Sequence, residues 1–307
     1  MKKDLLSIKN LTVDTIKDII KLSYKIKAKR YEWEFQPLAG KTIGMIFSKS
    51  STRTRVSFEV GIAELGGRSL FLTQNDLQLG RGETIEDTAR VMSRYIHGAV
   101  IRTYAHSDVE NFAKYFDYPV INALTDEFHP CQILTDLFTI HEFSGKTEGI
   151  SMAFIGDCAS NMANSMILAA KMSGIKLTLS SPEAYKPSES LMKDAGSAVS
   201  WTENVQEAVK NANYIYTDVW VSMGCEDEKA RRLKELQPYQ VNNELLKYAP
   251  SDVKIMHCLP AHRGEEITSA VMDSPASIVF DQAENRLHVQ KAILTMLTDE
   301  DWKRHIS

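Results

Sequence analysis

Short apolar runs alternate with longer amphipathic stretches along most of the chain. The stretches have helical spacing, and Gly66 and Gly174 are placed to end two of the helices. The apolar runs are rich in β-branched residues and predict buried strands at 42–47, 69–72, 99–101, 120–122, 150–155, 177–179, 198–201, 214–216, 253–256 and 278–280. Strands that alternate with helices indicate parallel sheets covered by helices on both faces. The pattern therefore predicts an α/β fold.

Some helix boundaries are also indicated by single residues. Pro130 has the position of a first-turn proline, and its helix should run to about Phe143. Ser107 and Glu110 form the pattern of a capping box at the start of another helix. A last helix is expected from about residue 282 to residue 298, and it could pack on either half of the chain.

The length of 307 residues suits two domains of about 150 residues each. A polar segment with two glycines, residues 144–149, separates the two strand–helix series. The predicted domains are therefore residues 1–145 and 146–285, each a doubly wound parallel sheet.

Composition excludes several classes of protein. The chain is 43% hydrophobic and 25% charged, as in ordinary globular proteins. Its 36 Lys and Arg against 40 Asp and Glu give a net charge of −4, so no overall field attracts nucleic acid or an anionic membrane. No apolar run approaches the ~20 residues that span a bilayer. With four cysteines, no C-x-x-C pair and no secretory signal, we expect reduced thiols and a cytoplasmic protein.

The residues after the first strand favour an anion site. Small hydroxyl residues, including Ser51 and Thr52, precede Arg53, Thr54 and Arg55 at the start of a helix. Backbone amides at a helix N-terminus and two arginines suit a phosphate-like dianion, although the spacing is not that of a P-loop. An N-capped helix with solvated arginines explains this segment, taken alone, equally well.

Other cationic residues also follow predicted strands. Arg102 ends one strand, and His129 and Gln132 lie one turn apart before a helix. A lone histidine is more often structural, but its coincidence with other cationic strand ends favours function. Arginine and a donor histidine near a carbonyl oxygen would stabilise a developing oxyanion. Arg286 brings a further arginine to a strand-to-helix junction.

The second half has different chemistry at its strand ends. Asp218 follows a strand and could bind an amine, whereas residues 226–235 are dense in charges of both signs and are typical of an exposed helix. Cys258 could be a hydrolase nucleophile, but neighbouring positions on a strand point to opposite faces, so His257 is poorly placed to activate it. The loop after strand 150–155 lacks the G-x-G-x-x-G dinucleotide fingerprint.

Three motifs together resemble the aspartate/ornithine carbamoyltransferase family. They are Ser-Thr-Arg-Thr-Arg at 51–55, His-Pro-Cys-Gln at 129–132 and His-Cys-Leu-Pro at 257–260. The last motif and Asp-x-Trp-x-Ser-Met-Gly at 218–224 are similar to the ornithine-specific members, and the resemblance covers essentially the whole chain. There are two departures. Ser160-Asn161 stands where members often have paired asparagines, and the basic targeting extension of organellar forms is not seen.

The resemblance implies transfer of a carbamoyl group from carbamoyl phosphate to the δ-amine of L-ornithine, with the active site in the cleft between the domains. The first domain, with helix 286–307 packed back on it, would bind carbamoyl phosphate, and the second would bind ornithine. The implied carbamoyl-phosphate ligands are Ser51, Thr52, Arg53, Thr54, Gln78, Arg102, His129, Gln132, Cys258, Leu259 and Arg286. The implied ornithine ligands are Asn161, Asp218, Ser222 and Met223. Gln78 would reach a neighbouring subunit, which implies a homotrimer or a multiple of trimers.

Arg102, His129 and Cys258 are the expected catalytic residues. The first two would stabilise the oxyanion, and Cys258, near Asp218, would help to position and deprotonate the δ-amine, a lysine-like group with a pKa of about 10.4. No metal or organic cofactor is expected.

Other functions remain open from the sequence. The acceptor could be putrescine, an N-acylated ornithine or aspartate, and a non-catalytic sensor of phosphate or amino acids could share the fold. A cysteine hydrolase is a third alternative. Arg53, Arg102, His129 and Cys258 occurring together argue against the sensor. Biosynthetic and catabolic use would share one site.

Overall fold

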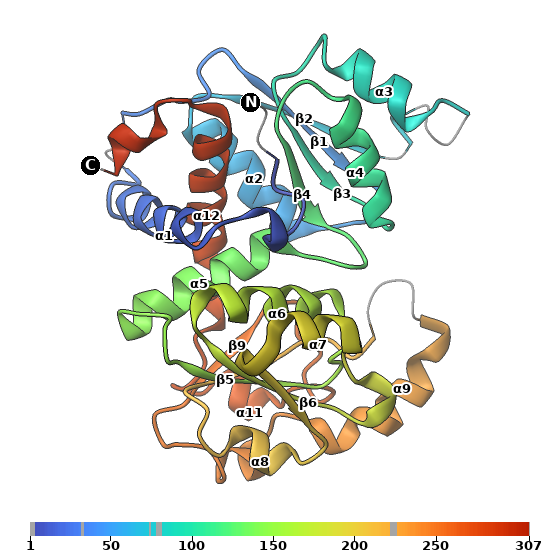
Figure 1. The fold of residues 1–307 in the computed structure, drawn as a ribbon, viewed down its shortest axis with the longest axis vertical. Coiled ribbons are helices and arrows are strands. Elements are labelled where there is room, and N and C mark those ends of the chain that lie inside the picture. The colour runs from blue at the N-terminus through green and yellow to red at the C-terminus, as the bar shows by residue number, and fades with distance from the viewer. Residues whose placement is uncertain (1–3, 32–33, 74, 78–81, 222–225, 307) are drawn as a thin grey trace. The chain divides into compact units, whose positions relative to one another are not determined.

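The computed structural model describes residues 4–31, 34–73, 75–77, 82–221 and 226–306 (Figure 1). The chain divides into two compact units. Unit 1 comprises Met1–Phe138 and Asn285–Ser307, and unit 2 comprises Thr139–Glu284. The boundary between Phe138 and Thr139 falls inside the helix Pro130–Ser144. The C-terminal segment from Asn285 belongs to unit 1.

Unit 1 is built on a parallel sheet with the strand order β2-β1-β3-β4. Its strands are β1 (Thr42–Phe47), β2 (Arg68–Thr73), β3 (Ala99–Arg102) and β4 (Val120–Leu124). The helices that contribute to unit 1 are α1 (Val13–Ala28), α2 (Thr52–Glu64), α3 (Ile85–Met92), α4 (His106–Tyr115), α5 (Pro130–Ser144) and α12 (Val279–Thr298). The order of the strands reverses between β1 and β3, and ligands of doubly wound sheets bind beyond the carboxyl ends at such a point.

Unit 2 has a parallel sheet with the order β7-β6-β5-β8-β9, so its reversal lies between β5 and β8. The strands are β5 (Ser151–Ile155), β6 (Lys176–Ser180), β7 (Val199–Thr202), β8 (Tyr214–Thr217) and β9 (Lys254–His257). The helices are α6 (Asn161–Ser173), α7 (Glu189–Ala195), α8 (Val205–Val209), α9 (Lys229–Leu236), α10 (Asn243–Leu246) and α11 (Ser269–Met272). In Figure 1, α6 and α7 lie on one face of this sheet and α8 and α11 on the other.

The predicted α/β class with two doubly wound parallel sheets is confirmed. Nine of the ten predicted strands are present, each with its ends within two residues of the expected positions. Gly174 ends α6 in the left-handed conformation, with φ of 74°, which glycine adopts without a steric penalty. Pro130 begins α5, as its position predicted.

The predicted strand 278–280 is wrong, because α12 begins at Val279. The strand-like contact is limited to one point, where Ile255 N–H donates to Ala276 O and Ile278 N–H donates to Ile255 O. The chain then turns directly into the helix. Arg286 consequently lies in the second turn of α12 and not at a strand-to-helix junction.

The predicted capping box at Ser107 is also wrong. Helix α4 begins at His106, and its N-cap residue Ala105 offers no side-chain hydrogen bond. Ser107 therefore lies inside the first turn, past the position from which a cap acts.

No helix among the described residues has both the length and the apolar character needed to cross a bilayer.

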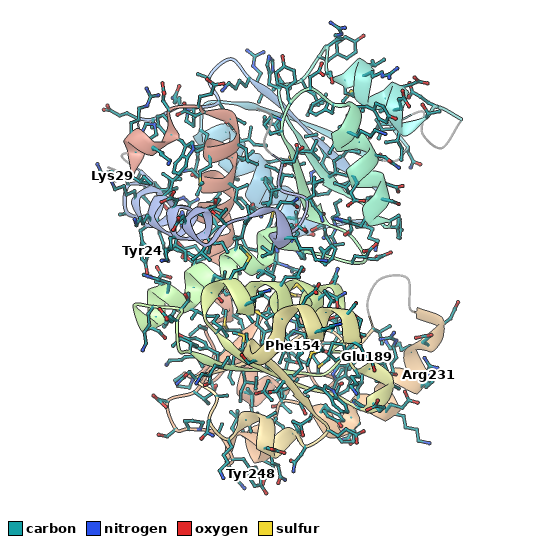
Figure 2. The ribbon with its side chains drawn as sticks, in the orientation of Figure 1. Tyr24, Lys29, Phe154, Glu189, Arg231 and Tyr248 are labelled. Carbon is teal, nitrogen blue, oxygen red and sulfur yellow. The ribbon has the colours of Figure 1, made fainter. Side chains whose placement is uncertain are left out.

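The core of unit 2 gives a test of packing. Phe154 of β5 is fully buried and stacks on Tyr216 with ring centroids 5.5 Å apart. Figure 2 shows Phe154 inside unit 2 and Tyr248, which is 51% exposed, at its periphery.

We expect Phe154→Ala to destabilise unit 2 by about 3–5 kcal/mol, because it removes a large buried ring and leaves a cavity. Urea unfolding followed by circular dichroism measures the change. Tyr248→Ala, the aromatic control at the surface, should change stability by less than about 0.5 kcal/mol. Equal losses in the two variants would contradict this account of the core.

Candidate active site

The N-terminus of α2 lies at the carboxyl end of β1, one of the two strands at the reversal point of unit 1. Ser51 is the N-cap residue, and its hydroxyl accepts the Thr54 N–H at 3.3 Å. Thr52 and Arg53 occupy the first turn, where backbone amides and the helix dipole favour an anion. Ser51, Thr52, Arg53 and Thr54 are thus together at one helix end, as an anion site requires.

Arg286 joins this helix end to α5. Its side chain is buried, with only 4% of the residue exposed. Nη2 donates to Thr54 Oγ1 at 2.7 Å, and Nη1 donates to Gln132 Oε1 at 2.6 Å. Gln132 in turn donates through Nε2 to Asp136 Oδ1 at 2.9 Å. The structure therefore places a buried, oriented positive charge next to the first turn of α2.

The positive charges of Arg286 and Arg102 both act on His129. Arg102 is the last residue of β3, the other strand at the reversal point, and both residues are buried. Burial, together with the positive charges of Arg286 and Arg102, holds the pKa of His129 well below its usual value. The imidazole is therefore neutral near pH 7, so it can donate one N–H without adding another positive charge.

Arg55 does not join this group, although the sequence places it among the strand-end arginines. It pairs with Glu59 at 3.0 Å and lies over the ring of Phe71, 3.8 Å from the ring centroid. Only Thr54 lies between Arg53 and Arg55 on the helix, so the two arginine side chains leave the helix in different directions.

In unit 2, two strand ends bring Asp218 and Cys258 together. Asp218 follows β8 and Cys258 follows the neighbouring strand β9. The Cys258 thiol donates to Asp218 Oδ1, with 3.0 Å between sulfur and oxygen. Burial raises the pKa of Asp218, against the opposing effects of His257, of this thiol and of the Val219 N–H. A buried carboxylate with a raised pKa favours a positively charged partner such as an amine.

The ring nitrogens of His257 make hydrogen bonds to groups other than the Cys258 thiol. Its Nδ1 accepts the Leu259 N–H at 2.8 Å, and its Nε2 lies 3.1 Å from Glu266 Oε1. In its neutral form the ring therefore carries its proton on Nε2 and donates to Glu266. Leu259 has a left-handed φ of 57°, and its bond to His257 holds this unusual conformation at the Cys258-Leu259 segment.

The other expected ligands are placed less completely. Asn161 is half-buried and begins α6, directly after the N-cap Ser160. Gln78, Ser222 and Met223 lie outside the described residues. The pKa of Cys131 is raised by burial to about 12, and burial also raises the pKa of Cys158, so neither is a reactive thiol near pH 7.

Two clusters of the described residues have donor atoms close enough to hold a metal ion. They are Asp218, His257 and Cys258, and His262, Glu265 and Glu266, each with the donor atoms within 4.8 Å of one another. Both ring nitrogens of His257 already make hydrogen bonds, and Glu266 accepts from His257 and from the His262 N–H. Hydrogen bonds among the protein's own groups therefore explain why the donor atoms of each cluster lie close together.

Lys49 is a candidate that the sequence argument missed. Its side chain is buried, pairs with Asp126 in the β4–α5 loop and lies 4.3 Å from the centroid of the Tyr104 ring. It precedes Ser51 by two residues, so its ion pair links the turn before α2 to the loop that carries His129. Its position within the Ser-Lys-Ser-Ser-Thr segment was the available signal, but its partner is distant in the sequence.

Known proteins match this chain over nearly its whole length. Residues 3–142 match the carbamoyl-P binding domain of the aspartate/ornithine carbamoyltransferase family, and residues 148–297 match its Asp/Orn binding domain. An ornithine carbamoyltransferase of Archaeoglobus fulgidus is 52% identical over 303 residues, which are 97% of this chain and 98% of that protein. One of Syntrophus aciditrophicus is 53% identical over 302 residues, 97% of this chain and 100% of that protein.

Solved structures give the same result. The ornithine carbamoyltransferase from Pyrococcus furiosus superposes with a TM-score of 0.91 at 48% sequence identity, covering 95% of this chain and 96% of that one. The ornithine carbamoyltransferase from Thermus thermophilus superposes with a TM-score of 0.90 at 37% sequence identity, covering 97% of this chain and 100% of that one. The likeness therefore extends to both units.

The depressed pKa of His129 predicts how its protonation affects stability. Below the usual value of 6.5, the unfolded chain binds a proton at this residue that the folded chain does not bind. The folded state should therefore lose stability as the pH falls below 6.5, and His129→Gln should lose less over the same interval. Urea unfolding of both proteins between pH 7.5 and about pH 5.5 measures the difference. Parallel pH curves would contradict the buried, neutral imidazole.

Proposed function

This chain belongs to the aspartate/ornithine carbamoyltransferase family, and on that premise we propose that it transfers the carbamoyl group of carbamoyl phosphate to the δ-amine of L-ornithine, giving L-citrulline and phosphate. The observation that carries the proposal is the cluster of Thr54, Gln132 and Arg286 beside a neutral His129 and Arg102. It unites an anion site with donors suited to a carbonyl oxygen.

The phosphate would bind at the first turn of α2. Ser51, Thr52, Arg53 and Thr54 offer backbone amides, hydroxyls and a guanidinium there. The buried charge of Arg286 beside Thr54 adds to the attraction for a dianion. As the bond between the carbamoyl carbon and the phosphate oxygen breaks, the same groups would stabilise the departing phosphate.

The carbamoyl end would meet Arg102, His129 and Gln132. When the amine nitrogen attacks the carbonyl carbon, negative charge develops on the carbonyl oxygen, and prepositioned donors lower the barrier. A neutral His129 suits this work because it offers one N–H to the oxygen without adding a further positive charge beside Arg102 and Arg286. Loss of one such donor typically raises the barrier by about 2.7–4 kcal/mol.

Ornithine would bind in unit 2. The buried carboxylate of Asp218 would hold the α-amino group, Asn161 would bind beside it, and Ser222 and Met223 complete the expected set. The thiol of Cys258 stands 3.0 Å from Asp218 Oδ1, so the thiol and carboxylate form one hydrogen-bonded pair. We assign to Cys258 the positioning of the δ-amine, whose proton the sulfur would accept while the thiol proton passes to Asp218 Oδ1. Cys258 and Leu259 would also border carbamoyl phosphate.

The homotrimer and the cytoplasmic location belong to the same proposal. Exposed apolar side chains on α2 and on the edge strand β2 support self-association: Val56 is 51% exposed, Val60 36% and Leu70 42%. Gln78, the residue expected to reach a neighbouring subunit, follows the end of β2 by five residues in the sequence. Self-association through the apolar surface on β2 would suit a shared active site.

Incubation of the purified protein with labelled carbamoyl phosphate and separate acceptors tests the activity. We expect citrulline from ornithine and little product from the other acceptors. Putrescine and N-acetylornithine lack the free α-amino-acid group that Asp218 and Asn161 suit, and aspartate has no δ-amine to place beside Cys258. Turnover with another amine alone would overturn the acceptor. Binding of carbamoyl phosphate without any product would favour the sensor, and activity that survives Arg53→Gln would favour a hydrolase.

Cys258→Ser tests the proton-accepting pair. Serine keeps a hydrogen bond to Asp218 but is a much weaker acid than a thiol, so kcat should fall by about 10²-fold and its pH profile should shift. Steady-state rates with saturating substrates between pH 6 and pH 10 measure both effects. Cys258→Ala, which lacks the bond to Asp218 as well, should be at least as impaired. Full activity with an unchanged profile would remove Cys258 from proton transfer.

A further inference from the structure

Arg232 of α9 joins the two strand ends that carry the proposed ornithine ligands. Its Nη1 donates to Asp157 Oδ2 at 2.7 Å and to the Trp220 carbonyl oxygen at 3.2 Å. Asp157 follows β5 and precedes Asn161 by four residues, and Trp220 follows β8 two residues after Asp218. One guanidinium thus contacts both sides of the reversal point of this sheet.

The surroundings of Arg232 differ from those predicted for an exposed charged helix. Only 14% of its side chain is exposed, against 60% for the neighbouring Arg231. Its Nε donates to Glu228 Oε2 at 2.8 Å, and its guanidinium lies 5.3 Å from the centroid of the Tyr185 ring. A planar fork with several partners, held against an aromatic ring, is a rigid connector that lysine cannot reproduce.

Asp157 passes this rigidity to the turn before α6. Its second oxygen, Oδ1, accepts the Ala159 N–H at 3.0 Å, so the carboxylate shapes the turn while it binds Arg232. The turn also packs closely on the β8 end. A Cβ atom on Gly156, which has φ of 124°, would lie 3.2 Å from Trp220 Nε1. The positions of Asn161 and Asp218 are therefore coupled through Asp157, Arg232 and Trp220.

We propose that Arg232 is a positioning residue for the amino-acid substrate. It holds Asn161 and Asp218 at a constant separation, so that the α-carboxylate and α-amino groups of ornithine meet both side chains together. Arg232 also neutralises the charge of Asp157, so that Asp218 is the carboxylate that attracts the ammonium group of the substrate. The inference rests on the proposed ornithine binding in unit 2 and adds a residue from outside the recognised motifs.

Steady-state kinetics of Arg232→Gln with each substrate varied tests the proposal. We expect the KM for ornithine to rise about tenfold, because small displacements of binding groups have large effects. The KM for carbamoyl phosphate, whose principal ligands lie in unit 1, should change less than about twofold. Arg232→Lys keeps the charge without the fork and should fall between wild type and Arg232→Gln. Arg231→Gln removes an adjacent exposed charge and should leave both constants unchanged.

Arg232→Gln leaves Asp157 buried without its ion-pair partner and could unfold the protein, so Asp157→Asn with Arg232→Gln is the second variant. Thermal unfolding should show that the double variant is more stable than Arg232→Gln, while its KM for ornithine stays raised. If the double variant restores both properties, Arg232 has only a structural role and the proposal is wrong. A folded Arg232→Gln with a KM for ornithine within about twofold of wild type would also overturn it. Wild-type protein that makes no citrulline would instead contradict the proposed function itself.

Discussion

The buried guanidinium of Arg286 sets the arrangement of unit 1. A charge removed from water is tolerated only where oriented oxygens replace its hydration. Thr54 of α2 and Gln132 of α5 supply such oxygens, so α12 can bury this residue only when both helices are in place. This requirement ties the C-terminal segment to unit 1, and it keeps a positive charge beside a helix N-terminus. The same charge contributes to the neutrality of His129.

The two units use charge in opposite ways. Unit 1 has Arg53 in the first turn of α2, Arg286 bonded to Thr54 in the same turn and Arg102 near His129, an arrangement that suits a phosphate. Unit 2 buries the carboxylates of Asp157, Asp218 and Glu266, and each has a described partner, Arg232, Cys258 and His257 respectively. The net charge of −4 conceals this separation. An anion and an amine can thus be attracted by one chain that has little overall field.

Errors in the sequence argument share a cause. The run 278–280 is as apolar as a strand, yet the chain makes only an isolated bridge to Ile255 there and enters α12 at Val279. From Asn285 onward this helix belongs to unit 1. Residues 227–235 are mostly exposed, as their composition predicted, but only 14% of the Arg232 side chain is exposed because it contacts Asp157 and Trp220. Lys49 pairs with Asp126, 77 residues away. In each case the environment comes from a distant element that no local window contains.

The sequence by itself determined the alternation of strands and helices and the residues that follow each strand. This was sufficient to identify Thr54, Arg102, His129, Asp218 and Cys258 as candidates, because a parallel sheet places all its carboxyl ends at one edge. Only the tertiary structure decided which of them touch. Arg286 meets Thr54 across 232 residues, Cys258 meets Asp218 across 40 and Arg232 meets Asp157 across 75. Such pairs depend on the packing of several elements at once, whereas strand ends depend only on local hydrophobic pattern.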